Sequence, residues 1–286
     1  MLTNGPLLIF FSSFFFACMS ILAKQVNASM PIMEIFFIRS AFGILVVFCL
    51  TAAGINEFRS GNTKLLIARG IIGGLAGFLY FFSLSMTTVG MATMLNYSFP
   101  IFVTLFSITF LKEKAGLDSI IALVVAFAGV FILVSPGYSG MNPGNLLGCA
   151  SAVMAGWAVL TMRELRKTDS SYMIFLSFST ASMIYSLPFA IRDFRAPGVN
   201  DLLFLVLMCA FSALGQITFT YSLKFTKAAI GSIVSMSTAV FAAAIGRIAL
   251  QEFFTTRFII GSILVMGSGI YLVWRYSAPA EPGSDL

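Results

Sequence analysis

Residues 32–53 read IMEIFFIRSAFGILVVFCLTAA, an apolar run in which Glu34 and Arg39 are the only charged side chains. An α-helix rises about 1.5 Å per residue, so a helix of this length crosses a hydrocarbon core roughly 30 Å thick. The run therefore predicts a transmembrane helix. Arg39 lies well inside it, roughly 10 Å from the nearer end, where a charge needs a partner or a role.

Comparable apolar runs follow one another along the whole chain. They predict spans at 5–24, 32–53, 65–85, 91–111, 118–135, 145–163, 171–190, 201–222, 229–249 and 257–275. The connections at 86–90 and 223–228 are short enough to predict tight hairpins. The fold class expected is an all-α membrane protein with ten transmembrane helices and no separate soluble domain.

The composition agrees with a lipid-embedded chain. Of 286 residues, 59% are hydrophobic and 10% are charged, whereas a soluble domain has about 25% charged residues. The net charge of +6 comes from Lys and Arg at the ends of apolar segments, where they meet lipid headgroups, so nucleic acid is not an expected partner. The four cysteines all lie in apolar stretches and are expected to pack rather than to form disulfides.

The chain contains no histidine, which removes the commonest general base and metal ligand. We predict neither a metal site nor a cofactor. The first apolar run lacks a cationic segment before it, since the first lysine is Lys24, so it is interpreted as a helix rather than a signal peptide. Eleven Lys and Arg residues, Arg69 among them, fall on the N-terminal side of the predicted membrane, against five on the other. This bias predicts a cell inner (cytoplasmic) membrane protein with both termini in the cytoplasm.

The sequence repeats itself with an offset of 139 residues. At this offset Lys24 falls on Arg163, Phe36 on Phe175, and Leu111-Lys112-Glu113 on Leu250-Gln251-Glu252. The predicted organisation is a first five-helix repeat at 1–139, a second at 140–276 and a disordered cytoplasmic tail at 277–286. Because five is odd, the second repeat must be inverted in the membrane. Inverted repeats place a substrate site near the bilayer midplane and permit alternating access.

Several stretches are similar to a known family. They are Glu34-Ile-Phe-Phe-Ile-Arg39, Tyr80-Phe-Phe-Ser-Leu-Ser-Met, Ala92-Thr-Met-Leu-Asn-Tyr-Ser-Phe-Pro100, Phe110-Leu-Lys-Glu113 and Gln251-Glu252. With the five-plus-five organisation, the chain resembles the drug/metabolite transporter (DMT) superfamily, specifically its EamA family. The resemblance implies a carrier with a central cavity, peripheral fifth and tenth helices and metabolite substrates. One departure is that Pro100 corresponds to Ala239, which leaves a proline-based hinge in one half only.

The fourth predicted helix carries a polar face. Thr93, Asn96, Tyr97, Pro100, Thr104 and Ser107 share one side of it, and their counterparts in the ninth helix include Ser232, Ser235, Met236 and Ala239. In lipid such a face must point into protein or into a water-filled cavity. We expect Thr93, Asn96, Tyr97, Ser232 and Ser235 to bind substrate and Pro100 to serve gating. Hydrogen bonding between helices is the alternative.

Arg39 is the only basic residue that the pattern places deep in a span. It is expected either to capture a substrate carboxylate or phosphate or to make internal contacts, and both readings stay open. Glu34 lies five positions away on a different side of the helix, so a direct pair with Arg39 is awkward. Glu34 is instead a candidate for coupling or gating.

Four further mid-span residues, Tyr80, Trp157, Gln216 and Thr220, complete the expected substrate-binding set. Glu113 and Glu252 end the fourth and ninth helices as solvated caps or gate latches. Gly70, Gly73, Gly74 and Gly77 form a small-residue stripe that predicts close helix packing.

These patterns favour a secondary transporter that moves a small polar metabolite, amino-acid-like or nucleoside-like, by alternating access. Its partners are then a small-molecule substrate and the lipid bilayer, and it is a monomer or a homodimer. A membrane channel and a membrane-embedded enzyme are the alternatives. The enzyme is disfavoured because no nucleophile–base pair is evident in the sequence.

Overall fold

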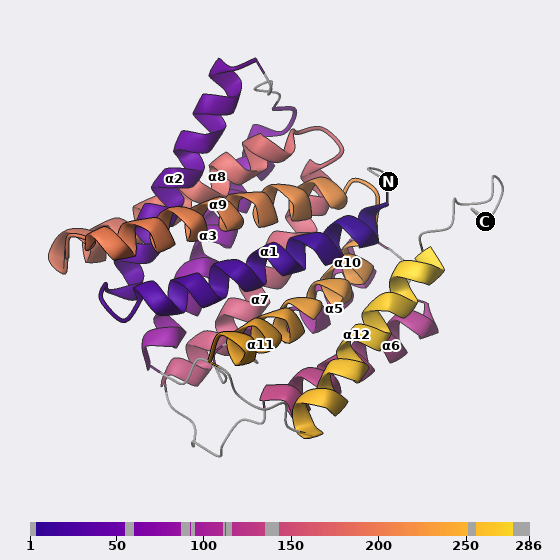
Figure 1. Cartoon of the computed structure of the whole chain (residues 1–286). Coiled ribbons are helices and arrows are strands. Elements are labelled where there is room, and N and C mark those ends of the chain that lie inside the picture. The colour runs from indigo at the N-terminus through magenta and orange to yellow at the C-terminus, as the bar shows by residue number, and fades with distance from the viewer. Residues whose placement is uncertain are drawn as a thin grey trace.

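The computed structural model describes residues 4–54, 60–86, 92, 95–110, 112, 116–134, 143–250 and 256–276. In this part of the chain the regular structure is helical throughout (Figure 1). The helices are α1 (Gly5–Val26), α2 (Ile32–Ala52), α3 (Thr63–Met86), α5 (Phe99–Phe110), α6 (Leu117–Val134), α7 (Pro143–Leu165), α8 (Ser171–Arg192), α9 (Val199–Ser222), α10 (Ala228–Ser235), α11 (Ser237–Leu250) and α12 (Thr256–Tyr276).

The helices correspond to the ten predicted spans, with α10 and α11 forming one span joined at Met236. Seven described helical segments are long and apolar enough to cross a membrane, and α5, α6 and α12 contribute shorter apolar stretches. Apart from the fourth span, the helix ends lie within about two residues of the predicted ones. The turn between α9 and α10 is the tight hairpin expected, and the one at 86–90 lies outside the described residues, as does the predicted tail.

The fourth and ninth spans are interrupted rather than continuous. Residues 95 and 96 are helical, Tyr97 and Ser98 form a turn, and α5 begins at Phe99. Pro100 explains this break, because a proline has no N–H to donate to the carbonyl four residues earlier. The ninth span breaks at Met236, the counterpart of Tyr97, although it has alanine where the fourth has proline.

Side-chain hydroxyls accompany the break at Met236. Ser235 Oγ donates to the carbonyl of Ser232 at 2.7 Å, and Thr238 Oγ1 donates to the carbonyl of Ser235 at 2.7 Å. Such hydroxyls compete with backbone amides and bend helices. The amides of Met236 and Ala239 bond three residues back, at 3.1 Å and 3.0 Å, as in a tightened turn. Helix breaks at this level therefore exist in both halves, and the one at Met236 forms without a proline.

The two halves are inverted relative to each other. The amide of Gly61, between α2 and α3, donates to Asp169 Oδ1 beside the α7–α8 turn at 3.2 Å. At the other end, Glu34 at the start of α2 accepts from the amide of Arg195, between α8 and α9, at 3.0 Å. The second connection of each half thus meets the first connection of the other half. Equivalent connections therefore lie on opposite sides, as the odd number of helices predicts.

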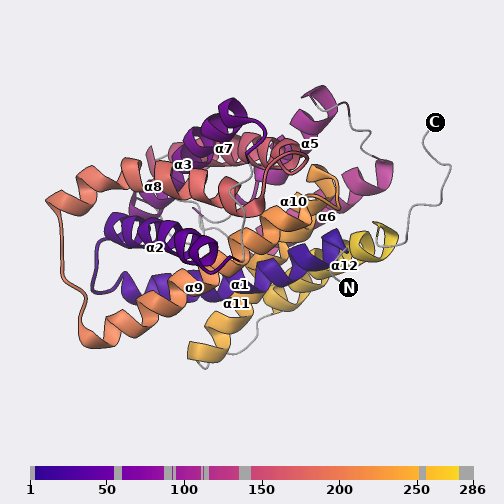
Figure 2. The same ribbon diagram turned by 90° about the horizontal axis from the view of Figure 1, so that it is seen from above.

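The last helix of each half lies at the edge of the molecule. α6 and α12 run side by side there (Figures 1 and 2), and Gly129 approaches Leu264 so closely that an added Cβ would lie 2.9 Å from the leucine Cβ. Arg275 and Asp118 form an ion pair of 4.0 Å at one end of this pair of helices. The start of α1 and the end of α12 lie on the same side of the molecule in both views.

The packing of α3 against α8 confirms the small-residue stripe. A Cβ added at Gly70 would come within 2.7 Å of Ser177, and one at Gly74 within 2.9 Å of Ala181. α3 lies against α8 along much of its length, whereas α9, the counterpart of α3, touches α2 over a much shorter stretch. The residues of α9 equivalent to Gly70 and Gly74 are the larger Cys209 and Ala213, so the two interfaces also differ in side-chain size.

Candidate substrate site

Arg39 points from α2 towards α8 and α9. Its Nε donates a hydrogen bond to Ser212 Oγ, and its guanidinium carbon lies 5.4 Å from the centre of the Phe178 ring. The side chain keeps part of its surface accessible. Because an arginine facing lipid at this depth costs about 2.5–3.5 kcal/mol or more, its accessible part must face the interior of the protein. Arg39 thus lies between the two halves.

Arg69 of α3 reaches the same ring. Its guanidinium carbon lies 5.2 Å from the Phe178 centre, and its side chain is only 3% exposed. The charge pattern predicts Arg69 at the cytoplasmic boundary, and its burial corrects this: Arg69 lies in the interior of the described bundle, as Arg39 does. Arg69 lies near the start of a predicted helix, where a basic residue normally meets lipid headgroups, so its burial was not predicted. Gly73, four residues later, is the sequence feature that indicates room for the side chain inside the bundle.

Gly73 makes room for the Arg69 side chain. A Cβ built at Gly73 would overlap Arg69 Nη1, which shows that the guanidinium lies over the glycine, one turn deeper in α3. Residues four apart lie on the same helix face, so any larger residue at 73 would push the arginine away. The glycine stripe therefore positions a charge as well as packing helices.

The thioether of Met162 contacts Arg69 of the first half of the molecule and Gln216 and Thr220 of the second half. Its Sδ accepts from Arg69 Nη2 at 3.3 Å and from Gln216 Nε2 at 3.8 Å. Thr220 Oγ1 lies 3.6 Å from the sulfur and donates to the carbonyl of Gln216 at 2.8 Å. All four side chains are buried. Gln216 and Thr220 were expected at the site, and the structure brings them next to Arg69 from α9. We name Arg39, Arg69, Met162, Phe178, Ser212, Gln216 and Thr220 the arginine cluster.

Residues of the fourth span lie against the second half. Asn96 Nδ2 donates to Ser151 Oγ of α7 at 3.1 Å, and the Tyr97 side chain lies close to Thr238 of α11 and Tyr80 of α3. The predicted polar face points inwards, since Pro100, Thr104 and Ser107 are buried while Ile101 and Leu105 on the other side are 40% and 53% exposed. Thr93 lies outside the described residues.

Other expected site residues have different neighbours. Ser232 is buried, and its hydroxyl donates to the carbonyl of Ala229 at 2.8 Å, much as Ser235 bonds within its own helix. The Trp157 ring stacks on Phe106 and meets Phe110, each at 4.6 Å between ring centres. These contacts join α7 to α5. Glu113 and Glu252 lie outside the described residues.

Glu34 lies beside a cavity of about 310 Å³ between α2 and α8. The walls are otherwise apolar and include Phe37, Leu187 and Phe194. Glu34 is 1% exposed, its Oε2 accepts the Arg195 amide, and its Oε1 has no hydrogen-bond partner among the described residues. It holds the α8–α9 connection and does not pair with Arg39, as the spacing predicted.

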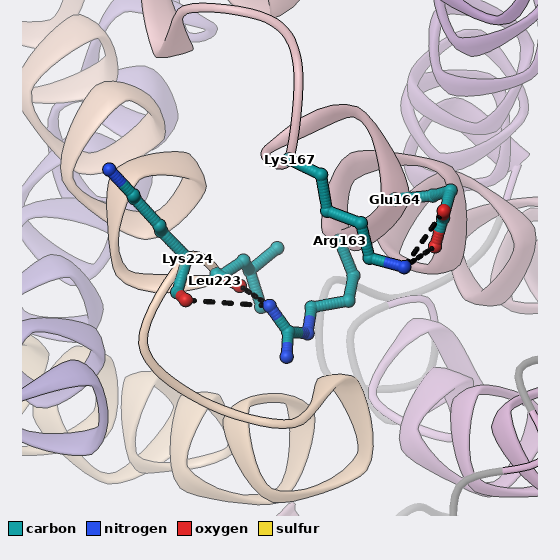
Figure 3. Close-up of polar contacts among 5 residues, drawn as sticks. All are labelled: Arg163, Glu164, Lys167, Leu223 and Lys224. Atoms are coloured by element: carbon teal, nitrogen blue, oxygen red, sulfur yellow. Dashed lines mark hydrogen bonds and ion pairs between the residues drawn. The ribbon is translucent and has the colours of Figure 1, made fainter.

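The opposite end of the bundle is held by basic side chains (Figure 3). Arg163 Nη1 donates to the carbonyls of Leu223 at 2.8 Å and Lys224 at 3.4 Å, which satisfies the C-terminal end of α9. Beside it, Lys167 pairs with Glu164 at 2.7 Å.

Arg166 in the following turn donates to the carbonyl of Asp169 and lies 5.8 Å from the centre of the Tyr221 ring. Burial lowers the pKa of Arg166, while Tyr221 and Asp169 act in the opposite direction. Asp169 in turn accepts the Gly61 amide, so this turn links the two halves at the end opposite to Glu34.

The arginine cluster is rich in donors and poor in acceptors. Two guanidinium groups and the Gln216 amide meet hydroxyls and one thioether, which is a weak acceptor. Among the described residues, no carboxylate forms an ion pair with either arginine. Such a site offers charge-assisted hydrogen bonds to an anionic group.

Inverted five-helix halves with a polar cluster between them are typical of membrane transporters. Comparison with known proteins gives the family of the chain. The model of the EamA-like transporter family matches it twice, at residues 3–135 and 142–275. The chain belongs to this family.

Two relatives agree with the family assignment, and one solved structure shares the fold. The pseudopaline exporter CntI of Pseudomonas aeruginosa is 30% identical over 95% of this chain and 96% of its own length. Solute carrier family 35 member G1 of Mus musculus is 30% identical over 81% of this chain and 67% of its own length. A crystal structure superimposes with a TM-score of 0.76 at 18% identity, covering 94% of this chain and 96% of the other. The chain is therefore a multi-pass membrane transporter and not an enzyme.

Proposed function

We propose that the chain is a secondary transporter that moves a small polar metabolite across the cytoplasmic membrane by alternating access, with both termini in the cytoplasm. The favoured substrate is amino-acid-like, with a carboxylate that binds Arg39. The single observation that carries the proposal is the contact of Arg39 with Ser212 and Phe178, which unites both halves around one cation. That the Pseudomonas aeruginosa relative is named an exporter of a metabolite supports the same class.

The depth of Arg39 supports a binding role. Arg39 and Phe178 are counterparts at the 139-residue offset, and they touch each other. Equivalent residues of two halves meet only close to the symmetry axis that relates them. For an inverted repeat this axis lies in the plane of the membrane, near its middle, where secondary transporters bind their substrates.

The unequal packing of the two halves supports alternation. The interface of α3 with α8 is extensive, and the equivalent interface of α9 with α2 is short. A carrier of two inverted halves opens to one side through one such interface and to the other side through its counterpart. We propose that exchange between these two packings is the transport step, and that the breaks at Tyr97 and Met236 absorb it.

A binding screen followed by transport assays tests this proposal. The purified protein is screened for thermal stabilisation by amino acids and nucleosides, and the stabilising compounds are then followed in counterflow into proteoliposomes. Arg39→Ala is expected to weaken transport about 10- to 100-fold, since a charge-assisted hydrogen bond contributes roughly 1.5–3 kcal/mol. Asn96→Ala is expected to cost about tenfold or less, as for a neutral bond.

Arg192→Gln is the matched control, because the Arg192 side chain is 83% exposed. The carrier proposal fails if Arg39→Ala transports normally at normal expression. It also fails if flux rises without saturation as substrate increases, which is the behaviour of a channel.

A further inference from the structure

Arg69 is a buried cation that forms no ion pair with any carboxylate in the part of the chain that the structure describes. Its Nε and Nη1 find no hydrogen-bond acceptor among the described residues, and its Nη2 reaches only the sulfur of Met162. Arg39 lies against the same Phe178 ring and bonds one hydroxyl. Two positive charges thus share one ring in the interior of a membrane protein.

This arrangement is costly in the absence of an anion. An arginine in the interior of a membrane protein is costly, and two like charges in a medium of low dielectric constant repel each other. The Phe178 ring offsets part of this through cation–π contact. The remaining donors of Arg69, Arg39 and Gln216 would be satisfied by carboxylate oxygens, which accept the fork of a guanidinium in pairs.

We infer that Arg39 and Arg69 form two subsites for one substrate that carries two anionic groups, such as an amino-acid-like dicarboxylate. The inference rests on the proposed function and narrows its substrate class. One acid group binds Arg39 beside Ser212, and the other binds Arg69 beside Gln216 and Met162. Phe178 borders both subsites, since both guanidinium carbons are within 5.4 Å of its ring centre.

The geometry limits the size of the ligand. Because both guanidinium carbons lie close to the Phe178 ring centre, the distance between them cannot exceed the sum of their two distances to that centre. Two carboxylates joined by a short carbon chain can span this distance. Arg39 is partly accessible and Arg69 is buried. The first acid group therefore meets Arg39 from the accessible side, and the second reaches Arg69 more deeply.

Matched pairs of ligands that differ by one charge provide the test. The full chain in nanodiscs is titrated with malonate, succinate, glutarate, adipate and glutamate, each beside its monomethyl ester, with glutamine as the partner of glutamate. At least one dianion, or glutamate, is expected to bind on the order of tenfold more tightly than its partner. Equal binding within every pair, or no binding by any of these probes, overturns the inference.

Variants assign the second charge to Arg69. In Arg69→Gln the preference for the doubly acidic member should fall to about one, while the singly acidic member binds as before; Arg192→Gln should leave the preference unchanged. Arg69→Lys keeps the charge and loses the fork, and it should retain an intermediate preference. If the preference is absent but Arg39→Ala still abolishes transport, only the two-subsite inference fails. Normal transport by Arg39→Ala would instead remove the proposed function.

Discussion

At the scale of single residues, Met162 shows how unsatisfied the arginine cluster is. A thioether is a weak acceptor, yet this one accepts from Arg69 and Gln216, while the nearby Thr220 hydroxyl donates to the carbonyl of Gln216 at 2.8 Å. Buried donors normally find carbonyl or carboxylate oxygens. The sulfur satisfies them only weakly, so a ligand oxygen can replace it at little cost.

The position of Arg69 depends on the absence of a side chain at 73. Gly73→Ala adds a Cβ where Arg69 Nη1 lies, so the guanidinium must move away from its place at the ring. Helix propensity favours the alanine by about 1 kcal/mol, and we therefore expect a folded protein whose transport falls roughly 10- to 100-fold. Counterflow at matched protein amounts measures this.

Gly267→Ala makes the same chemical change in α12, at a position where an added Cβ meets nothing within 4 Å. This control should transport normally. Unchanged transport by Gly73→Ala would mean that the Arg69 position does not matter for the substrate.

At the scale of helices, the sequence predicts well which segments are helical and how long they are, and poorly whether each helix is continuous. Hydropathy reports how long a segment is apolar, so the span ends were placed closely. It carries no information on whether the i to i−4 hydrogen bonds run unbroken through Met236. The contact of Trp157 with Phe106 and Phe110 could not be predicted from hydropathy either, because the packing of neighbouring helices decides which aromatic residues face each other.

The two interfaces of the proposed cycle can be locked separately. Gly70→Cys with Ser177→Cys, in a protein whose native cysteines are replaced, should form a disulfide between α3 and α8. A Cβ added at Gly70 would lie 2.7 Å from both Ser177 Oγ and the Ser177 carbonyl oxygen, so the two helices must separate slightly to admit the pair, and the reduced double-cysteine protein is the reference. We expect oxidation to stop transport and a reductant to restore it, because the helices must separate in each cycle.

Gly129→Cys with Leu264→Cys joins α6 to α12 and serves as the control. These helices lie at the edge of the molecule (Figure 2), so this disulfide should leave transport largely intact. Full transport with the α3–α8 disulfide closed would contradict alternation at that interface.

At the scale of the whole molecule, two loop contacts establish the inverted arrangement and leave the absolute orientation to charge. The excess of Lys and Arg on the side of Ser60 predicts that this side faces the cytoplasm. Moving Arg69 from the boundary to the interior lowers that excess by one and does not reverse it. The sequence alone does not show which basic residue near a membrane boundary extends its side chain along its own helix into the interior, as Arg69 does.

Single cysteines report the orientation. In a cysteine-free background, Ala196→Cys should react with a membrane-impermeant thiol reagent in intact cells, because the α8–α9 connection is expected outside and Ala196 is exposed. Ser60→Cys should react only after the cells are opened. The opposite pattern would place both termini outside the cytoplasm.

The meeting of Arg39 with Phe178 has a consequence for how such a site can arise. A pair of identical five-helix chains, one inserted upside down, would carry the same residue at both of these places. Two arginines would then confront each other across the axis, or two phenylalanines would leave the centre without charge. Joining both copies in one polypeptide allows a cation on one side and an aromatic ring on the other, so the substrate can be held in a single orientation.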